Sequence, residues 1–276
     1  MHSKLATARP ARGLADLVTA YRGYCYAGAR PGMHVGLPSA TLTAIVSLDG
    51  LVHTLRPPEP AQHAVALEAL VCGLHTRPAH VHEPGRGRGI GIDLTPAGCR
   101  SLLGMPVSEI GGRVLPLDEL LGPPGRALLE RLLEAGSWPA RFAVLDDVLL
   151  RSRDRLRPVN SAVERAWSRL TGAPVRVDTV AAEVGYSTRH LAERFSREYG
   201  LRPKTAARLA RFDRSHGLLQ VADPPTLAAV ATACGYADQA HLAREWREFA
   251  GASPTGWRAG EDLLFVQDEP GREQAR

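Results

Sequence analysis

The chain has 276 residues, of which 44% are hydrophobic and 23% charged, and its formal net charge is +5. This composition is typical of a folded globular protein, and the length predicts two domains. Collagen-like, coiled-coil and disulfide-scaffold classes are excluded, and no stretch approaches the ~20 apolar residues that span a bilayer. The first residues, MHSKLATARPARG, lack the apolar stretch of a secretory signal, so we expect a cytoplasmic protein without membrane contact.

The positive charge is concentrated in the second half of the chain. Residues 1–150 contain 14 Lys and Arg against 13 Asp and Glu, whereas 151–175 contain 6 against 2 and 176–260 contain 12 against 9. Residues 261–276, with 2 against 5, form an acidic tail. A basic region is what contact with phosphates requires, although a solvated basic surface predicts the same counts.

The first half has the pattern of an α+β domain. Residues 1–20 predict a loose polar arm followed by a short helical stretch. Between 21 and 95, short apolar runs alternate with Gly and Pro turns, which predicts the strands of a small barrel or sandwich. A helix is expected over 95–104, with Thr95 as its cap and Gly104 at its end.

Helical periodicity returns after a connector at 105–121. It predicts helices over 126–136 and 139–153, which either pack within the monomer or form a dimer interface. Pro158 and a basic composition place a domain boundary in 155–160. A helix over 160–170 is expected to open the second domain.

The cysteines and histidines of the first half show no pattern of a metal site. None of Cys25, Cys72, Cys99 and Cys234 has zinc-ligand spacing, so they are expected to be free and mostly buried thiols. The cluster His75, His80, His82 and Glu83 lacks a glutamate at 86, where a metal-binding cupin would need one, and surface-loop histidines are favoured. We expect no catalytic site, no metal and no cofactor, and therefore not an enzyme.

The second half contains an internal repeat, in which residues 177–203 resemble 227–254. Gly185 matches Gly235 at an offset of 50, and after one inserted residue Ser187 matches Asp238 at an offset of 51. Each copy predicts a short helix, a glycine turn, and a second helix capped by a side-chain oxygen. This is the helix-turn-helix pattern, whose second helix enters the major groove of DNA. A single helix over 203–221 is expected to join the two units.

Residues 160 to 258 resemble the AraC/XylS family of transcriptional regulators. The resemblance rests on the double unit, the connecting helix with Arg208 and Arg211, and the closing sequence GYADQAHLAREWREFAGASPTGWR at 235–258. It implies a chain with two helix-turn-helix units that binds promoter DNA. Many such regulators carry an N-terminal β-barrel that binds a small effector and helps dimerisation, and the first half is compatible with that plan.

Exposed positions at the start of each second helix are the expected base-reading residues. They are Thr188, Arg189, Ala192 and Glu193 in the first unit, and Gln239, Ala240, His241 and Arg244 in the second. Glu193 either reads a cytosine or orients an arginine, and His190 and His241 either pack or read bases. The expected phosphate contacts are Ser187, Arg194, Arg197, Lys204, Arg247 and Arg258.

The sequence thus predicts three regions: a sensory and dimerisation domain over 1–155, a DNA-binding domain over 156–260, and the acidic tail. Expected partners are double-stranded DNA, a second copy of the chain, RNA polymerase and an unidentified small-molecule effector. Two alternatives remain open. One is a DNA-binding module fused to a cysteine-based DNA-alkylation response domain, and the other is a non-specific architectural DNA binder.

Overall fold

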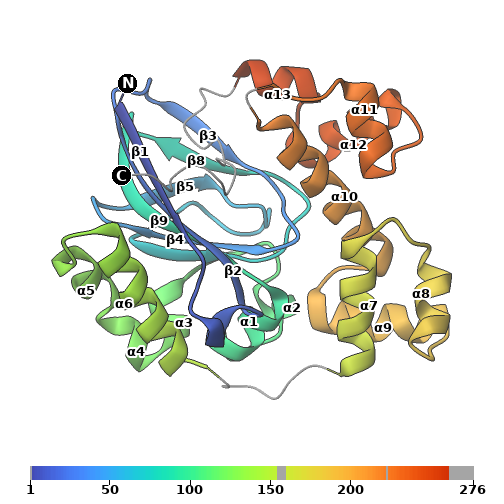
Figure 1. Cartoon of the computed structure of the whole chain (residues 1–276), viewed down its shortest axis with the longest axis horizontal. Helices are drawn as coiled ribbons and strands as arrows, with labels where there is room; N and C mark the ends of the chain where they lie inside the picture. Colours follow the sequence, from blue (N-terminus) through green and yellow to red (C-terminus); the bar gives the residue numbers. More distant parts are fainter. Residues whose placement is uncertain (1, 154–159, 222, 261–276) are drawn as a thin grey trace.

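A β-rich N-terminal domain and a helical C-terminal domain lie side by side in the computed structural model (Figure 1). The model describes residues 2–153, 160–221 and 223–260. The predicted fold class, α+β followed by all-α, is confirmed. The residues around the predicted boundary at 155, and the acidic tail at 261–276, lie outside the described residues.

Two antiparallel sheets build the N-terminal domain, one with the strand order β1-β2-β9-β4-β7-β10 and one with the order β3-β8-β5-β6. The strands of the first are β1 (His2–Ala8), β2 (Val18–Ala27), β9 (Arg86–Leu94), β4 (Leu42–Ser47), β7 (Ala69–Cys72) and β10 (Val114–Pro116). The strands of the second are β3 (Gly32–Gly36), β8 (Ala79–Glu83), β5 (Val52–Arg56) and β6 (Val65–Leu67).

Alternation along the six-stranded sheet separates a core face from a pocket face. On β4, the side chains of Leu42, Ala44 and Val46 belong to the main core, whereas Thr43 and Ile45 line a pocket. The cause is the two-residue period of a strand, which sends successive side chains to opposite faces.

Glycines on β9 leave room for two tyrosine rings on the pocket face. A Cβ on Gly89 would lie 2.5 Å from the Tyr24 hydroxyl, and one on Gly87 would lie 2.7 Å from the Tyr26 ring. Both distances are far shorter than carbon can tolerate, so the rings packed across this strand require glycine at positions 87 and 89.

Two sequence predictions for this domain are wrong. The predicted loose arm at the start of 1–20 is strand β1, which pairs along its length with β2 from His2↔Ala27 to Ala8↔Tyr21, whereas the short helical stretch predicted after it is present as the 3-10 turn η1 (Arg12–Leu14). The predicted connector at 105–121 contains helix α2 (Val107–Ile110), strand β10 and helix α3 (Leu117–Leu121). The apolar pattern of these segments is too weak to predict regular structure. They form it because β1 pairs with β2 and β10 pairs with β7.

The predicted helix at 95–104 is confirmed as α1 (Pro96–Gly98), which continues into the π-helical turn η2 (Cys99–Leu103). The Thr95 hydroxyl accepts a hydrogen bond from the Gly98 N–H at 3.0 Å, and Gly104 ends the segment at a φ of +74°. A left-handed backbone of this kind favours glycine.

Short helices cover the core face of the six-stranded sheet (Figure 1). Besides α3, they are α4 (Pro123–Arg126), α5 (Leu128–Glu134) and α6 (Trp138–Arg151). Helix α6 is fixed to the sheet by Phe142, whose ring stacks on Tyr21 at 5.8 Å, and by Asp146, which accepts a hydrogen bond from the Tyr21 hydroxyl at 2.9 Å. The predicted helices at 126–136 and 139–153 are thus confirmed.

Seven helices form the described part of the C-terminal domain. They are α7 (Ser161–Gly172), α8 (Val177–Glu183), α9 (Thr188–Tyr199), α10 (Pro203–Leu219), α11 (Leu227–Cys234), α12 (Gln239–Ala250) and α13 (Pro254–Gly260). Helix α10 joins the two halves, as predicted. Within the described residues, no helix combines the length and apolar character needed to cross a membrane.

Candidate nucleic-acid interface

The turn between the two helices has the same construction in both halves of the C-terminal domain. Gly185 and Gly235 both adopt a φ of +77°, which an L side chain tolerates poorly. The next residue donates its backbone N–H to an alanine carbonyl in both copies, Tyr186 to Ala181 at 2.9 Å and Tyr236 to Ala231 at 2.8 Å. The repeat in the sequence is therefore a repeat in backbone geometry.

The second helix of each unit begins with the predicted cap. The Ser187 hydroxyl accepts from the His190 N–H at 3.2 Å, and the Asp238 carboxylate accepts from the His241 N–H at 2.6 Å. Each cap satisfies a backbone donor that the first turn of a helix leaves free. As a result, α9 and α12 start at equivalent positions.

Each second helix is held by a fully buried i, i+4 pair. In α9 the pair is Leu191 and Phe195, and in α12 it is Leu242 and Trp246, all with 0% exposure. Trp246 also donates its indole N–H to the Ser215 hydroxyl of α10 at 2.9 Å. Phe195 and Trp246 are core residues, as predicted, and their rings are not available to stack on bases.

His190 and His241 brace the turns. The His190 ring meets the Tyr186 ring edge-on with centroids 4.6 Å apart, and His241 meets Tyr236 in the same way at 5.2 Å. In addition, the Nδ1 atom of His241 lies 3.3 Å from the Ala237 backbone nitrogen, which donates to it. The packing alternative is thereby supported for both histidines, while base contact by His241 stays a prediction.

The expected base-reading side chains lie on the outer surface of α9 and α12. Thr188, Arg189 and Glu193 are exposed on α9, and Ala192 is half-buried. On α12 the exposed members of the set are Gln239, Ala240 and Arg244, with His241 half-buried. None of these side chains is fully buried, so the first turns of both helices are accessible to a partner.

Glu193 pairs with Arg189 one turn earlier on α9. Arg189 Nε lies 3.1 Å from Glu193 Oε1, and the Arg189 side chain is 91% exposed. An exposed pair of this kind contributes little to stability, about 0.3–0.5 kcal/mol. The pair is compatible with the orienting role of Glu193, cytosine readout by Glu193 stays a prediction, and Arg189 remains exposed.

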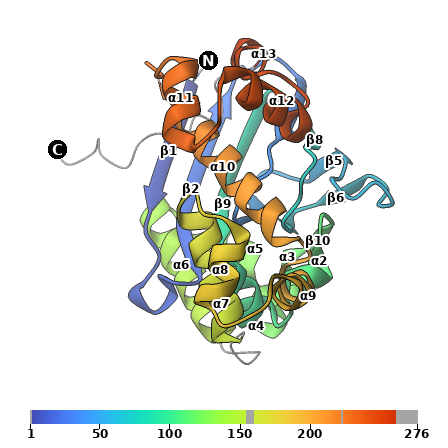
Figure 2. The ribbon, with the colours of Figure 1, turned by 90° about the vertical axis from the view of Figure 1, so that its right-hand side faces the viewer.

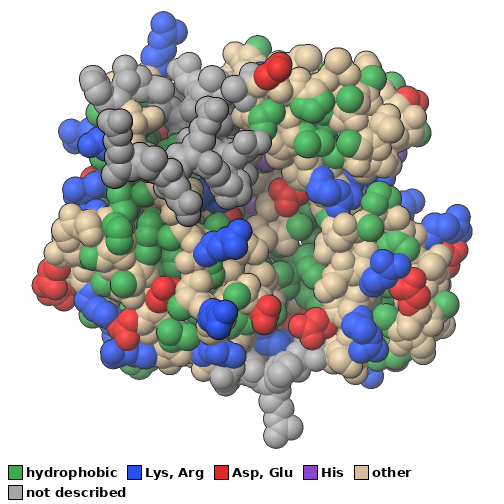
Figure 3. All heavy atoms as spheres, viewed as in Figure 1, with side chains coloured by type: hydrophobic (Ala, Val, Ile, Leu, Met, Phe, Trp, Pro, Cys, Tyr) green, Lys and Arg blue, Asp and Glu red, His purple; other side chains and the backbone are tan. Residues whose placement is uncertain are grey.

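The expected phosphate contacts are also at the surface. Arg194, Arg197, Lys204, Arg247 and Arg258 are all exposed, and Ser187 is exposed while serving as the cap. On the face shown in Figure 3, however, Lys and Arg side chains are spread over both domains. The two equivalent helices α9 and α12, rather than the distribution of charge, therefore mark the candidate interface, with Lys204 next to them on α10 and Arg258 on α13.

Viewed from the side, α9 and α12 lie on the same side of the C-terminal domain, beyond opposite ends of α10 (Figure 2). Helices α8 and α11 lie on the other side. The connecting helix is locked to α12 by ion pairs of Arg208 and Arg211 with Glu245, whose side chain is 2% exposed. These pairs restrain the second unit relative to α10. The sequence singled out both arginines but not their partner.

The N-terminal domain grips α9, a contact that the sequence did not indicate. Arg100 forms two hydrogen bonds with Glu198, from Nε at 2.9 Å and from Nη2 at 2.6 Å, and the hydrogen bonds to Glu198 raise the pKa of Arg100. The Ser108 hydroxyl donates to the Arg197 carbonyl at 2.6 Å. Because 98 and 89 residues separate these partners, only the folded chain brings them together.

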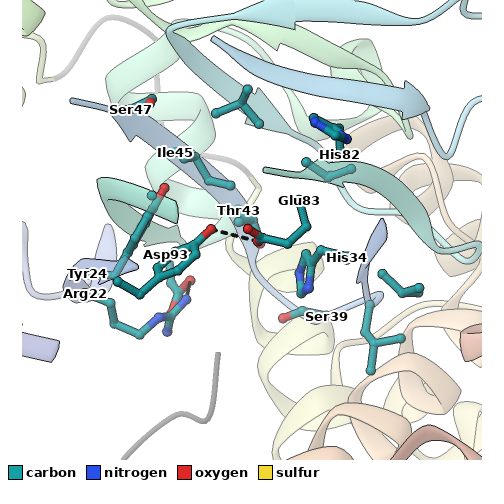
Figure 4. Close-up of a pocket in the computed structure, with 18 of the residues that line it drawn as sticks. Arg22, Tyr24, His34, Ser39, Thr43, Ile45, Ser47, His82, Glu83 and Asp93 are labelled. Carbon is teal, nitrogen blue, oxygen red and sulfur yellow. Dashed lines mark hydrogen bonds and ion pairs between the residues drawn. The ribbon is translucent and has the colours of Figure 1, made fainter. Parts of the chain in front are cut away.

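A second contact between the domains lies at α10. Its Asp213 carboxylate accepts hydrogen bonds from the Ser39 hydroxyl at 3.2 Å and the Ala40 N–H at 3.1 Å. Beside it is a cavity of about 470 Å³, lined by residues of both sheets together with Asp213 and His216 of α10 and its C-cap residue Gln220 (Figure 4). The cavity therefore spans the boundary between the β-rich domain and the DNA-binding half.

Within the part of the chain that the structure describes, no group of three or more His, Cys, Asp or Glu side chains could hold a metal ion. Cys72 and Cys99 are buried free thiols, as predicted, and burial raises the pKa of each to about 12. His80 and His82 lie on strand β8 instead of the predicted surface loop, because the run AHVHE pairs with β3. His75 alone of that cluster lies in a loop, where Nδ1 contacts the Arg77 carbonyl.

Comparison with known proteins adds two family matches. Residues 180–260 match a family described as a helix-turn-helix domain, and residues 6–116 match a family described as a domain of unknown function (DUF6597). A search of curated proteins found no significant match.

Several solved structures are similar. ToxT from Vibrio cholerae O395 is 9% identical, with a TM-score of 0.54 over 90% of this chain and 98% of ToxT. ToxT from Vibrio cholerae strain SCE256 with a bound unsaturated fatty acid is 8% identical, with a TM-score of 0.54 over 90% of this chain and 96% of that one. A probable AraC family transcriptional regulator from Rhodopseudomonas palustris is 30% identical over 36% of this chain and 98% of its own length, with a TM-score of 0.33. The likeness to ToxT shows a shared two-domain fold.

Proposed function

We propose that this chain, a DNA-binding transcriptional regulator whose C-terminal domain belongs to the AraC family, reads a specific DNA site with α9 and α12 in successive major grooves. The observation that carries the proposal is the duplicated unit, with equivalent turns, caps and exposed leading side chains. Successive major grooves on one face of a duplex are roughly 34 Å apart. Two reading helices beyond the ends of one connecting helix suit that spacing.

Base readout is assigned to the exposed starts of the two helices. Arg189 and Arg244 have the donor fork that pairs with guanine, and Gln239 has the amide that pairs with adenine. Ala240 suits a thymine methyl group. Glu193 accepts from a cytosine amino group or keeps Arg189 in position. These contacts would supply sequence discrimination.

Phosphate binding is assigned to the exposed cations around these helices, together with the cap Ser187. A cation that contacts a phosphate adds affinity for every duplex and makes binding depend on salt. Its side chain carries no information about sequence. The cations are Arg194, Arg197, Lys204, Arg247 and Arg258.

The N-terminal domain acts as the regulatory partner in this proposal. It holds α9 through Arg100 and Ser108, and it shares a cavity with α10, so a ligand in the cavity would favour one arrangement of the domains. The fatty acid named for one ToxT structure is consistent with effector binding in this fold. Dimerisation is assigned to α5 and α6, where Leu133 and Leu150 are 49% and 41% exposed. Contact with RNA polymerase is a further element of the proposal.

The deciding experiment is selection of bound duplexes from a random pool by the full chain, followed by affinity measurements on selected and scrambled sites. We expect two conserved half-contacts about one helical turn apart and a preference of at least ~10³-fold. A palindromic arrangement of the selected sequences would indicate a dimer on DNA. Equal affinity for all duplexes would instead establish a non-specific architectural binder.

A further inference from the structure

The cavity between the β-rich domain and α10 has a floor of two tyrosine rings. Tyr24 and Tyr26 project from β2 with ring centroids 6.1 Å apart, over the glycines of β9 that make room for them. The remaining walls carry apolar side chains, among them Ile45 and Val81. Such a cavity, in the size range of small-molecule sites, suits a ligand with an apolar or aromatic body.

The charged side chains that line the cavity are mostly acidic. Four carboxylates, those of Asp49, Glu83, Asp93 and Asp213, face two arginines, Arg22 and Arg86. Arg22 is paired with Asp93 through both of its terminal nitrogens, beside Tyr24 in Figure 4. Asp213 accepts hydrogen bonds from Ser39 and Ala40, and burial raises its pKa, so the surplus of negative charge rests on Asp49 and Glu83, which outnumber the remaining Arg86.

Two of the histidines on the walls, His34 and His216, do not offset this surplus. Burial lowers the pKa of His34 and of His216 to about 4, so both rings are neutral at pH 7. By contrast, Asp49 and Glu83 lie near enough to Tyr24 to raise the pKa of its hydroxyl electrostatically, after the larger effect of burial. Carboxylates beside aromatic faces are the groups that stabilise an organic cation.

An independent observation on α10 also indicates a missing donor. Gln220 lines the cavity with a side chain in a residue only 8% exposed, and among the described residues its Oε1 atom has no hydrogen-bond partner. A buried acceptor without a donor is costly, and it is rare in folded proteins. Gln220, the C-cap residue of α10, follows Asp213 and His216 by seven and four residues, a spacing that places all three on one side of the helix.

We infer that the cavity binds a small organic cation, a protonated amine on an apolar or aromatic body, with its N–H groups directed to the carboxylates and to Gln220 Oε1. This inference rests on the proposed function, in which the cavity is the effector site. The ammonium group meets Asp49 and Glu83 beside the tyrosine faces, while Gln220 joins the ligand to α10. A carboxylate ligand such as a fatty acid would face the acidic surplus with Arg22 already paired.

The test is binding of a matched series to the full chain without DNA, measured by isothermal titration calorimetry at millimolar ligand. Phenethylamine, phenethyl alcohol and hydrocinnamate share one aromatic body and differ in charge, and oleate represents a lipid carboxylate. We expect phenethylamine to bind most tightly, with hydrocinnamate and oleate at least about tenfold weaker. Stronger binding of either carboxylate, or binding of none of the four, would overturn the inference.

Variants of the lining residues test whether phenethylamine binds in this cavity. Gln220→Leu should weaken phenethylamine about tenfold, and Gln220→Glu, which keeps the size and adds a charge, should strengthen it. Asp49→Asn should weaken it about threefold, whereas Glu134→Gln, which removes one exposed charge from α5 outside the cavity, should change nothing. Unchanged binding of phenethylamine by both Gln220 variants would also contradict the inference.

DNA binding is measured separately, so the two proposals fail in different ways. Amine binding that leaves DNA affinity unaltered would support the ligand class and contradict the effector role. A lack of any selected DNA site would contradict the proposed function, and the calorimetric result would still decide the ligand class.

Discussion

Arg100, in the π-helical turn of the N-terminal domain, holds Glu198 on the reading helix α9 through two hydrogen bonds of 2.9 and 2.6 Å. The Arg100 side chain is 21% exposed and that of Glu198 is 10% exposed. The pair holds the C-terminal end of α9 against the N-terminal domain, whereas Arg189, near the N-terminal end of α9, remains exposed. The N-terminal domain therefore contacts the helix that is proposed to read DNA.

Arg100→Ala should destabilise the chain by about 2 kcal/mol, because it leaves the Glu198 carboxylate shielded from water without its cation. The measurement is the unfolding free energy from urea titration. The double variant Arg100→Ala with Glu198→Gln should recover part of the loss, since no unpaired charge remains. An unfolding free energy of Arg100→Ala equal to that of the parent would show that the Arg100–Glu198 pair does not stabilise the protein in solution.

Arg189→Ala and Arg244→Ala should each weaken binding to the selected site by about 1–3 kcal/mol and relax the preference at one base pair. The reason is the loss of a two-pronged contact with guanine. The measurement is the dissociation constant on the selected site and on single-base variants of it. If these variants and Arg197→Ala had the same effect on specific and random duplexes, the assignment of base contacts would be wrong.

Lys204→Ala and Arg197→Ala should weaken binding to all duplexes similarly and reduce the slope of log K against log salt by about 0.9 for each lost phosphate contact. The measurement is affinity at several salt concentrations. Arg126→Ala is the matched control, because Arg126 is exposed on α4 of the N-terminal domain, away from α9 and α12. A slope that stays at the parent value for Lys204→Ala would remove that residue from the phosphate set.

Cys72 and Cys99 should react slowly with a thiol reagent at pH 8 in the folded protein. With the pKa of each raised to about 12 by burial, only about one thiol in ten thousand is ionised at that pH. The measurement is intact mass after timed labelling, in which Cys25, the half-buried cysteine, is expected to react first. Urea should make all four reactive.

The raised pKa values of Cys72 and Cys99 predict the direction in which the stability of the protein changes with pH. The folded state holds these protons more tightly than the unfolded chain, where the pKa is about 9, so their contribution to stability is complete below pH 9. This contribution to stability is lost as pH rises from about 9 towards 12.

A stable methyl adduct on Cys25, Cys72 or Cys99 after incubation with alkylated DNA would support the alternative of a DNA-alkylation response domain.

Local patterns in the sequence were enough to predict the C-terminal domain. The caps Ser187 and Asp238, the turn glycines, and the buried pairs Leu191 with Phe195 and Leu242 with Trp246 all act within one or two helical turns. Their spacing therefore encodes the structure directly. The same reasoning failed for residues 2–8, because an edge strand such as β1 is stabilised by the backbone of β2 and needs no apolar run of its own.

The tertiary structure alone decided how the two halves are joined. Nothing near Arg100 in the sequence indicates Glu198, and Ser39 gives no sign of Asp213, because an ion pair or hydrogen bond between distant segments leaves no periodicity to read. The cavity has the same origin, since its walls come from two sheets and one helix. Sequence by itself determined that this chain carries two helix-turn-helix units. Folding determined which side chains of the other domain touch them, because those contacts depend on the packing of whole elements rather than on neighbours along the chain.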